Sequence, residues 1–116
     1  MTFKRLNNKI LGWAKDKGIF DKSTPLSQHS KTLEEIEELS MAISAQYAGK
    51  EEFLDDYGAL KNTNEEIKDA IGDIIVTLMI QAKMQGLTIE ECLESVYNII
   101  SKRTGKMVDG IFVKDK

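Results

Sequence analysis

Residues 63–85 form an apolar-rich segment that constrains the fold more than any other part of the chain. Its central part, AIGDIIVTLMI at residues 70–80, contains a single charged side chain, Asp73. Short apolar runs of this kind can also be buried strands, because periodicity alone does not separate the two. The pattern continues for about twenty residues with only Gly72 interrupting it, which favours a helix that is surrounded by other helices.

Two further helices are predicted in the N-terminal part of the chain. Apolar side chains at helical spacing place the first over residues 3–13, and Gly18 ends it. Thr24 followed by Pro25 is typical of an N-cap and a first helical position, so a second helix is expected to run from there to about Tyr47. The core face of this second helix is expected to consist of Leu33, Ile36, Leu39 and Ile43.

Capping boxes mark the start of the remaining two helices. Thr63-x-x-Glu66 opens the apolar helix described above. Thr88-x-x-Glu91 opens a last helix, which is expected to run to about Arg103. Each of these helices is followed by a glycine, the residue type most common just past a helix C-terminus.

The other segments lack helical periodicity. Residues 48–62 are interpreted as a linker with at most one short helical turn. The tail MVDGIFVKDK has an Asp-Gly pair between apolar residues, so it either forms a small hairpin or packs across the helices. A chain of 116 residues is long enough for one compact domain and too short for two. The expected fold is therefore a single all-α domain over residues 1–116, built from four main helices.

Charge and composition argue against several classes of protein. The formal net charge of −3 argues mildly against a nucleic-acid partner, because such binders usually carry a basic patch. No apolar run approaches the roughly 20 residues of a membrane helix, and the N-terminus lacks the apolar stretch of a signal peptide. Cys92 is the only cysteine, so no internal disulfide can form. We therefore expect a cytoplasmic protein with no membrane partner.

Carboxylates gather on one face of each of two helices. Asp69 and Asp73 lie one turn apart on the apolar helix, where an isolated buried carboxylate would be costly without a cation. The preceding helix contains KTLEEIEELSMAI, in which Glu34, Glu35 and Glu38 share the side opposite the apolar face. A hard divalent cation would relieve the repulsion between these groups. Oxygen ligands favour Mg²⁺, or alternatively Mn²⁺, over zinc.

The last helix supplies positive charge near its end. Asn98 and Lys102 are one turn apart, and Arg103 and Lys106 follow. A magnesium ion together with Lys and Arg side chains can bind a polyphosphate and stabilise the charge that develops during its cleavage.

Three segments in this order resemble the MazG-like nucleotide pyrophosphohydrolases of the all-α nucleoside triphosphate pyrophosphatase superfamily. They are KTLEEIEEL at residues 31–39, DAIGDII at residues 69–75 and YNIISKRTGKM at residues 97–107. The resemblance extends from about Trp13 to Val113. It implies Mg²⁺-dependent hydrolysis of a nucleoside triphosphate, including deoxy- and non-standard ones, to the monophosphate and pyrophosphate. It also implies a homo-oligomer, a dimer or a tetramer, that completes the helical core.

Metal ligands are carried over from the family's two acidic motifs. The first motif implies Glu35 and Glu38 as ligands, and the second implies Asp73. The glutamate expected three residues before Asp73 is replaced by Ala70, so the number of bound ions stays open. Asp69 is the nearest replacement on the same face.

The resemblance implies further roles for other residues. Glu34 is either an additional ligand or the base that orients water, and Lys102, Arg103 or Lys106 neutralises the leaving pyrophosphate. Glu66 and Asp69 also have the spacing of the second motif, but the capping box already assigns Glu66 another role. The expected substrate-binding residues are Trp13, Gln28, Lys31, Asn98 and Lys106.

Each pattern also has a simpler structural interpretation. A run of glutamates is by default a solvated face, and cations near a helix C-terminus are common. Trp13 fits a core position, and Lys31 can pair with Glu34 or Glu35 along the helix. Asp73 in its apolar run, together with the ordered motifs, favours an enzyme. The alternative function is a catalytically inactive helical interaction module of the same fold, which the alanine at position 70 would suit.

Overall fold

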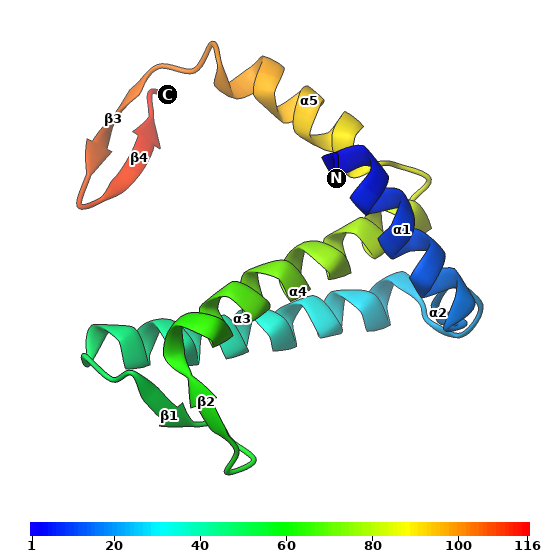
Figure 1. Cartoon of the computed structure of the whole chain (residues 1–116). Helices are drawn as coiled ribbons and strands as arrows, with labels where there is room; N and C mark the ends of the chain where they lie inside the picture. The colour runs from blue at the N-terminus through cyan, green and yellow to red at the C-terminus, as the bar shows by residue number, and fades with distance from the viewer.

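The computed structural model describes residues 1–116 and is mostly helical (65%), with five helices and two small hairpins (Figure 1). None of the helices has the length and apolarity that crossing a membrane would require. The helices are α1 (Phe3–Asp16), α2 (Ile19–Lys22), α3 (Pro25–Tyr47), α4 (Thr63–Met84) and α5 (Ile89–Ile100). The strands are β1 (Glu52–Leu54), β2 (Leu60–Asn62), β3 (Gly105–Val108) and β4 (Ile111–Lys114). The prediction of four main helices is thus confirmed for α1, α3, α4 and α5, and it is incomplete because it lacks the short helix α2 and the strands β1 and β2.

Helix α3 begins and ends where the sequence predicts. The Thr24 hydroxyl accepts a hydrogen bond from the Ser27 backbone N–H at 3.1 Å, and Pro25 is the first helical residue. The capping box of α5 is also confirmed, since the side chains of Thr88 and Glu91 each accept from the other's backbone N–H at 3.1 and 2.7 Å. Helix α5 stops at Ile100, a turn earlier than expected.

The predicted capping box of α4 is wrong. Asn62 is the N-cap, and its Oδ1 accepts from the backbone N–H of Glu65 at 3.0 Å. Thr63 is the first helical residue, and its hydroxyl donates to the carbonyl of Lys50 at 2.7 Å. Asparagine and threonine are both good N-caps, so the sequence alone did not distinguish Asn62 from its neighbour Thr63. As a consequence, Glu66 has no capping role.

The predicted linker over residues 48–62 contains the β1–β2 hairpin. Its strands are antiparallel, with Glu52 opposite Asn62, and are too short to show an alternating pattern in the sequence. The turn is held by Asp55, whose Oδ1 accepts from the backbone N–H groups of Tyr57 at 2.9 Å and Ala59 at 2.8 Å. This hairpin lies beside the end of α3 and the start of α4 (Figure 1).

Helices α3 and α4 run antiparallel and pack through small and polar side chains. At the centre of their contact, Thr32 Oγ1 donates to Thr77 Oγ1 at 2.9 Å. The buried residues of α3 are Gln28, Thr32, Glu35, Ala42 and Ala45, and those of α4 include Ala70, Thr77 and Ile80. Small residues let the two helices approach closely, which explains why this face makes the contact.

The expected core face of α3 is therefore not the face that packs on α4. Leu33 is 53% exposed, and Ile36 and Ile43 are also exposed. Ile71 and Ile75 of the apolar run on α4 are exposed as well, so α4 is not surrounded by helices of its own chain. The predictions of a buried apolar face on α3 and of an α4 enclosed by helices are therefore wrong for this chain, because the contact between the two helices uses their small and polar side chains instead.

The C-terminal tail forms the hairpin that was one of its two predicted alternatives. Asp109 and Gly110 make the turn with φ angles of 50° and 81°, the left-handed conformation expected for an Asp-Gly hairpin. Gly105 opens β3, where an added Cβ would clash with the carbonyl oxygen of Val113. Figure 1 shows α5 and this hairpin reaching away from the body formed by α3 and α4.

Candidate metal centre

Carboxylates of α3 and α4 face one another along the contact between the two helices. From the Thr32–Thr77 hydrogen bond, one turn forward on α3 leads to Glu35 and one turn back on α4 leads to Asp73. Glu35 acts electrostatically on both Asp73 and Glu38. Antiparallel packing thus brings the acidic motif of α3 close to the acidic motif of α4.

Glu35 is the buried member of this group, with 6% of its surface exposed. Lys31 Nζ lies 3.2 Å from Glu35 Oε1 and 3.4 Å from Glu34 Oε2. The other oxygen, Glu35 Oε2, is buried and has no hydrogen-bond partner. An unpartnered buried carboxylate oxygen is costly unless a positive or donating group meets it, and a protonated Glu38 is one such donor. A divalent cation held by oxygen ligands fits that requirement.

Two carboxylates near Glu35 have raised pKa values. Burial raises the pKa of Asp73, and the charges of Glu35 and Asp69 raise it further. Burial also raises the pKa of Glu38, with additional effects from Glu35 and then Glu66. Burial is the largest cause of both shifts, and repulsion from neighbouring carboxylates adds to it; a bound cation would counter both effects.

The pKa of Lys31 is also perturbed. Its partial burial acts to lower the pKa, but the hydrogen bond and charge of Glu35, together with Glu34, outweigh burial and raise it. Lys31 therefore stays charged and holds Glu35 in place along the helix. A single ammonium group on one oxygen of Glu35 leaves the second oxygen free for another ligand.

The raised pKa values predict a pH dependence of metal-free stability. A carboxyl group whose folded-state pKa is raised stabilises the fold below its ordinary pKa, and this contribution is lost as the pH rises through the folded value. For Asp73 and Glu38 the window begins at their ordinary values of 3.8 and 4.5. The metal-free protein should lose free energy of unfolding across this window, and Asp73→Asn should lose less. Urea denaturation of both proteins from about pH 4 to about pH 7 measures the difference, and identical slopes would contradict it.

The carboxylates lie around the helix contact, but they do not form a complete set of metal ligands. No three acidic, histidine or cysteine side chains are arranged closely enough to hold an ion. Asp73 is exposed at the edge of the contact, so the expectation of a buried carboxylate in the apolar run is wrong, and Glu38 is only half-buried. Side chains at such positions change rotamer freely, so these two can turn toward Glu35 without a change in the backbone.

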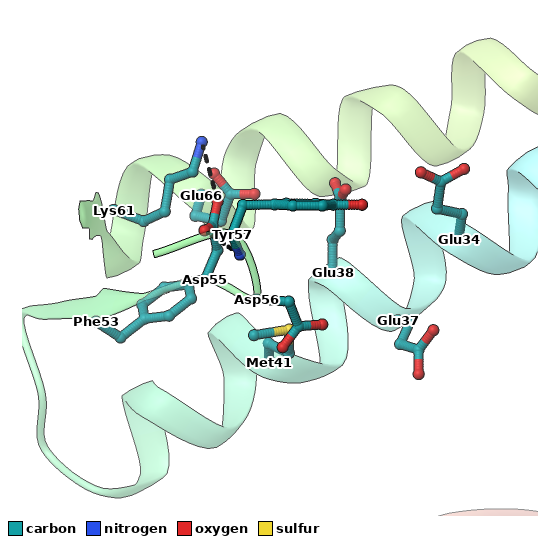
Figure 2. Close-up of a pocket in the computed structure, with 10 residues that line it drawn as sticks. All are labelled: Glu34, Glu37, Glu38, Met41, Phe53, Asp55, Asp56, Tyr57, Lys61 and Glu66. Atoms are coloured by element: carbon teal, nitrogen blue, oxygen red, sulfur yellow. Dashed lines mark hydrogen bonds and ion pairs between the residues drawn. The ribbon is translucent and has the colours of Figure 1, made fainter. Parts of the chain in front are cut away.

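A pocket of about 170 Å³ opens next to these carboxylates, between the two long helices and the β1–β2 hairpin. Figure 2 shows the ring of Tyr57 reaching past Glu66 toward Glu38. Tyr57 is 90% exposed, and Lys61 Nζ lies 4.0 Å from Asp55 Oδ2 on the same hairpin. The lining residues are Glu34, Glu37, Glu38, Met41, Phe53, Asp55, Asp56, Tyr57, Lys61 and Glu66.

Glu66 is the residue of this region that the sequence interpretation passed over. It lines the pocket, and its charge acts on Glu38. The signal was present in the spacing Glu66-x-x-Asp69, and the mistaken capping box removed Glu66 from consideration. Ala70, which stands where the family motif has a glutamate, is 1% exposed, and Glu66 and Asp69 are the carboxylates that precede it on α4.

The other expected site residues fall into two groups. Gln28 is buried, with its Nε2 3.5 Å from the Thr77 carbonyl oxygen, and Trp13 is half-exposed on α1. Asn98 lies on α5, while the three cations Lys102, Arg103 and Lys106 lie in the turn after it and on β3. Figure 1 shows that this turn is well separated from the middle of α3 and α4 of the same chain.

Comparison with known proteins identifies the family to which this chain belongs. Residues 23–108 match the MazG nucleotide pyrophosphohydrolase domain, and this chain belongs to that family. It is also 32% identical over 93 residues to an uncharacterized 18.2 kDa protein of the rep-hol intergenic region of Haemophilus phage HP1. The match covers 80% of this chain and 46% of the phage protein, so the chain spans about half the length of that relative. No solved structure matches the chain.

Proposed function

We propose that the chain is a Mg²⁺-dependent hydrolase that cleaves a nucleoside triphosphate to the monophosphate and pyrophosphate. The observation that carries the proposal is the buried, unpartnered Oε2 of Glu35, with Glu38 and Asp73 beside it. Family membership supports a nucleotide as the substrate class.

In this proposal Glu35, Glu38 and Asp73 hold the ion. Glu66 or Asp69 completes the set in place of the family glutamate that Ala70 replaces. When bound, Mg²⁺, or Mn²⁺ in its place, supplies charge neutralisation and Lewis-acid activation of phosphate oxygens. The donor set fits such an ion because it consists of carboxylate oxygens alone.

Glu34 has the position of a general base. It is exposed, it lines the pocket, and its only ion pair is the 3.4 Å contact with Lys31. A water held by Glu34 gives up its proton to the carboxylate as the water oxygen bonds to the α-phosphorus. The bond between the α-phosphorus and the bridging oxygen breaks, and pyrophosphate leaves with the electron pair. Cationic side chains stabilise that leaving group.

The hairpin pocket offers a surface for the nucleoside. Tyr57 is exposed and reaches over the acidic groups in Figure 2, where a base could stack on its ring. Gln28, by contrast, is engaged with the Thr77 carbonyl inside the helix contact. We therefore set Gln28 aside and add Tyr57 to Trp13, Lys31, Asn98 and Lys106 as a substrate-binding candidate.

The proposal is tested by pyrophosphate release from a panel of ribo- and deoxyribonucleoside triphosphates, with and without Mg²⁺. An active enzyme should produce equal amounts of monophosphate and pyrophosphate, and only in the presence of the metal. Absence of turnover on every substrate, with no effect of Mg²⁺ on the melting temperature, would contradict the proposal. That outcome would favour the alternative of a helical interaction module.

A further inference from the structure

The turn of the β1–β2 hairpin fixes the positions of two side chains that line the pocket. The carbonyl of Asp55 accepts from the N–H of Gly58 at 3.0 Å, so Asp56 and Tyr57 occupy the two central positions of the turn. Gly58 follows with a φ of 80°, the left-handed conformation that closes a hairpin of this kind. The turn therefore places Asp56 and Tyr57 side by side on the wall of one pocket.

One face of the Tyr57 ring is turned toward the side of the pocket that holds Met41 and Asp56. Figure 2 shows the ring edge-on, with both of these side chains on the same side of its plane. Met41 is half-buried on α3, whereas Tyr57 is 90% exposed. A flat base can stack on the open face of the tyrosine ring and contact the methionine with its other face. The edge of such a base then lies beside the Asp56 carboxylate.

The charges of the pocket determine which part of a nucleotide fits there. Most of its lining side chains are carboxylates, and its only cation, Lys61, lies 4.0 Å from Asp55 Oδ2. Carboxylates repel phosphate groups. The triphosphate therefore belongs at the proposed cation site on α3 and α4, and the uncharged base is the part of the substrate that this pocket accepts.

Asp56 is a carboxylate of this pocket that neither the fold nor the proposed reaction uses. Asp55 holds the turn by accepting from the N–H groups of Tyr57 and Ala59. Asp56 is exposed, and no ion pair or hydrogen bond within the chain engages its side chain. Both of its oxygens are free to accept hydrogen bonds from a ligand.

An ionised carboxylate has two acceptor oxygens and no donor, and this limits the bases that it can pair with. Guanine carries two adjacent donors on its Watson–Crick edge, the N1–H and the 2-amino group. Adenine and cytosine present a donor next to an acceptor, and uracil and thymine place their N–H between two carbonyl oxygens. A carboxylate at the edge of the base therefore pairs with guanine through two parallel hydrogen bonds, whereas the other bases bring an acceptor against it.

We propose that the hairpin pocket selects guanine nucleotides, with Tyr57 as the stacking surface and Asp56 as the acceptor for the guanine N1–H and 2-amino groups. This selectivity rests on the proposed function, because it names the base of the triphosphate that is cleaved between α3 and α4. Recognition of the base uses neither the metal ligands nor the reacting phosphorus, so it can be measured without turnover.

Two monophosphates that differ by a single amino group test the pairing. Deoxyguanosine and deoxyinosine monophosphate differ only in the 2-amino group, and neither has a bond that the enzyme would cleave. In calorimetric titrations with Mg²⁺ present, the wild type should bind the guanine nucleotide about 10-fold more tightly, within the range of a bidentate contact to a base. Asp56→Asn should bind the two nearly equally, because the amide offers one acceptor in place of two.

Matched variants identify the side chains responsible. Glu37→Gln removes another carboxylate that lines the pocket, but Figure 2 shows this side chain pointing away from the Tyr57 ring, so the preference for guanine should remain. Tyr57→Phe should bind both monophosphates as the wild type does, whereas Tyr57→Ala should weaken both by a similar factor, because it removes the stacking surface.

The same proteins are then assayed for pyrophosphate release from the two corresponding triphosphates. A wild type that binds neither monophosphate, or both equally, would overturn the guanine assignment, and so would an Asp56→Asn variant that keeps the preference. A preference that disappears in Asp56→Asn, in a protein that cleaves no triphosphate, would leave base recognition in place and overturn the proposed function. Cleavage of both triphosphates at one rate, with equal binding of the monophosphates, would support the proposed function and overturn the guanine pocket.

Discussion

Asp73→Asn is expected to lower Mg²⁺-dependent pyrophosphate release by at least about 100-fold, the scale on which single groups at metal and charge-stabilising sites act. Asparagine keeps the size of the side chain and removes its charge, so the ion loses a ligand from α4. The fold should be retained, because Asp73 lies at the solvent edge and its charge repels Glu35. Initial rates of pyrophosphate release, together with circular dichroism, measure both effects.

Matched variants separate this effect from a general loss of negative charge. Glu37→Gln alters a neighbouring carboxylate on α3, outside the proposed ligands, and should leave the rate nearly unchanged. Glu66→Gln should weaken the apparent affinity for Mg²⁺, whereas Glu65→Gln, one residue earlier in the first turn of α4, should not. If Asp73→Asn and Glu37→Gln behaved alike, the carboxylate pair across the helices would have no catalytic role.

Ala70→Glu is expected to lower the melting temperature of the metal-free protein by roughly 10 °C. Ala70 is 1% exposed, and it lies nearly two turns along α4 from the Thr77 end of the Thr32–Thr77 hydrogen bond. A glutamate there overfills a close helix contact and adds a charge to a repelling group, at a cost of about 2–3 kcal/mol. For a chain of this size each kcal/mol corresponds to about 4 °C or more.

Mg²⁺ should restore a large part of that lost stability, because the new carboxylate occupies the position of the family glutamate. Ala70→Gln is the control, since it adds nearly the same volume without the charge and should gain little from the ion. Thermal melts of both variants with and without Mg²⁺ provide the comparison. Equal melting temperatures for the two variants under both conditions would mean that only packing changes at this position.

The helices could be predicted because their signals are local. Thr24-Pro25 and the Thr88 capping box fix helix starts through hydrogen bonds within four residues. At the start of α4, two adjacent residues, Asn62 and Thr63, can both act as the N-cap. The hydroxyl of Thr63 donates to the Lys50 carbonyl, which comes near only in the folded hairpin, and Asn62 is the N-cap. The β1–β2 strands were missed because three residues are too few for a pattern.

The contact faces could be predicted only in part, because burial in one copy differs from burial in an assembly. The apolar stripe with Leu33 and Ile36 is the strongest signal in α3, yet α4 packs on the alanine side. Helix geometry predicted that Glu35 and Asp73 belong to one group; in the structure the charge of Glu35 raises the pKa of Asp73, but no three carboxylates lie close enough to hold an ion. Lys102 lies in the turn after α5, away from these carboxylates in the same chain, and no spacing within the sequence indicates that separation.

Crystals grown with Mn²⁺ and a slowly hydrolysed triphosphate analogue test the shared metal site most directly. The expected result is an anomalous peak within about 2.0–2.4 Å of Glu35 Oε2 and of carboxylate oxygens of Glu38 and Asp73, at distances typical of hard cations. An occupied triphosphate with no ion between α3 and α4, and with Asp73 turned to bulk solvent, would contradict it.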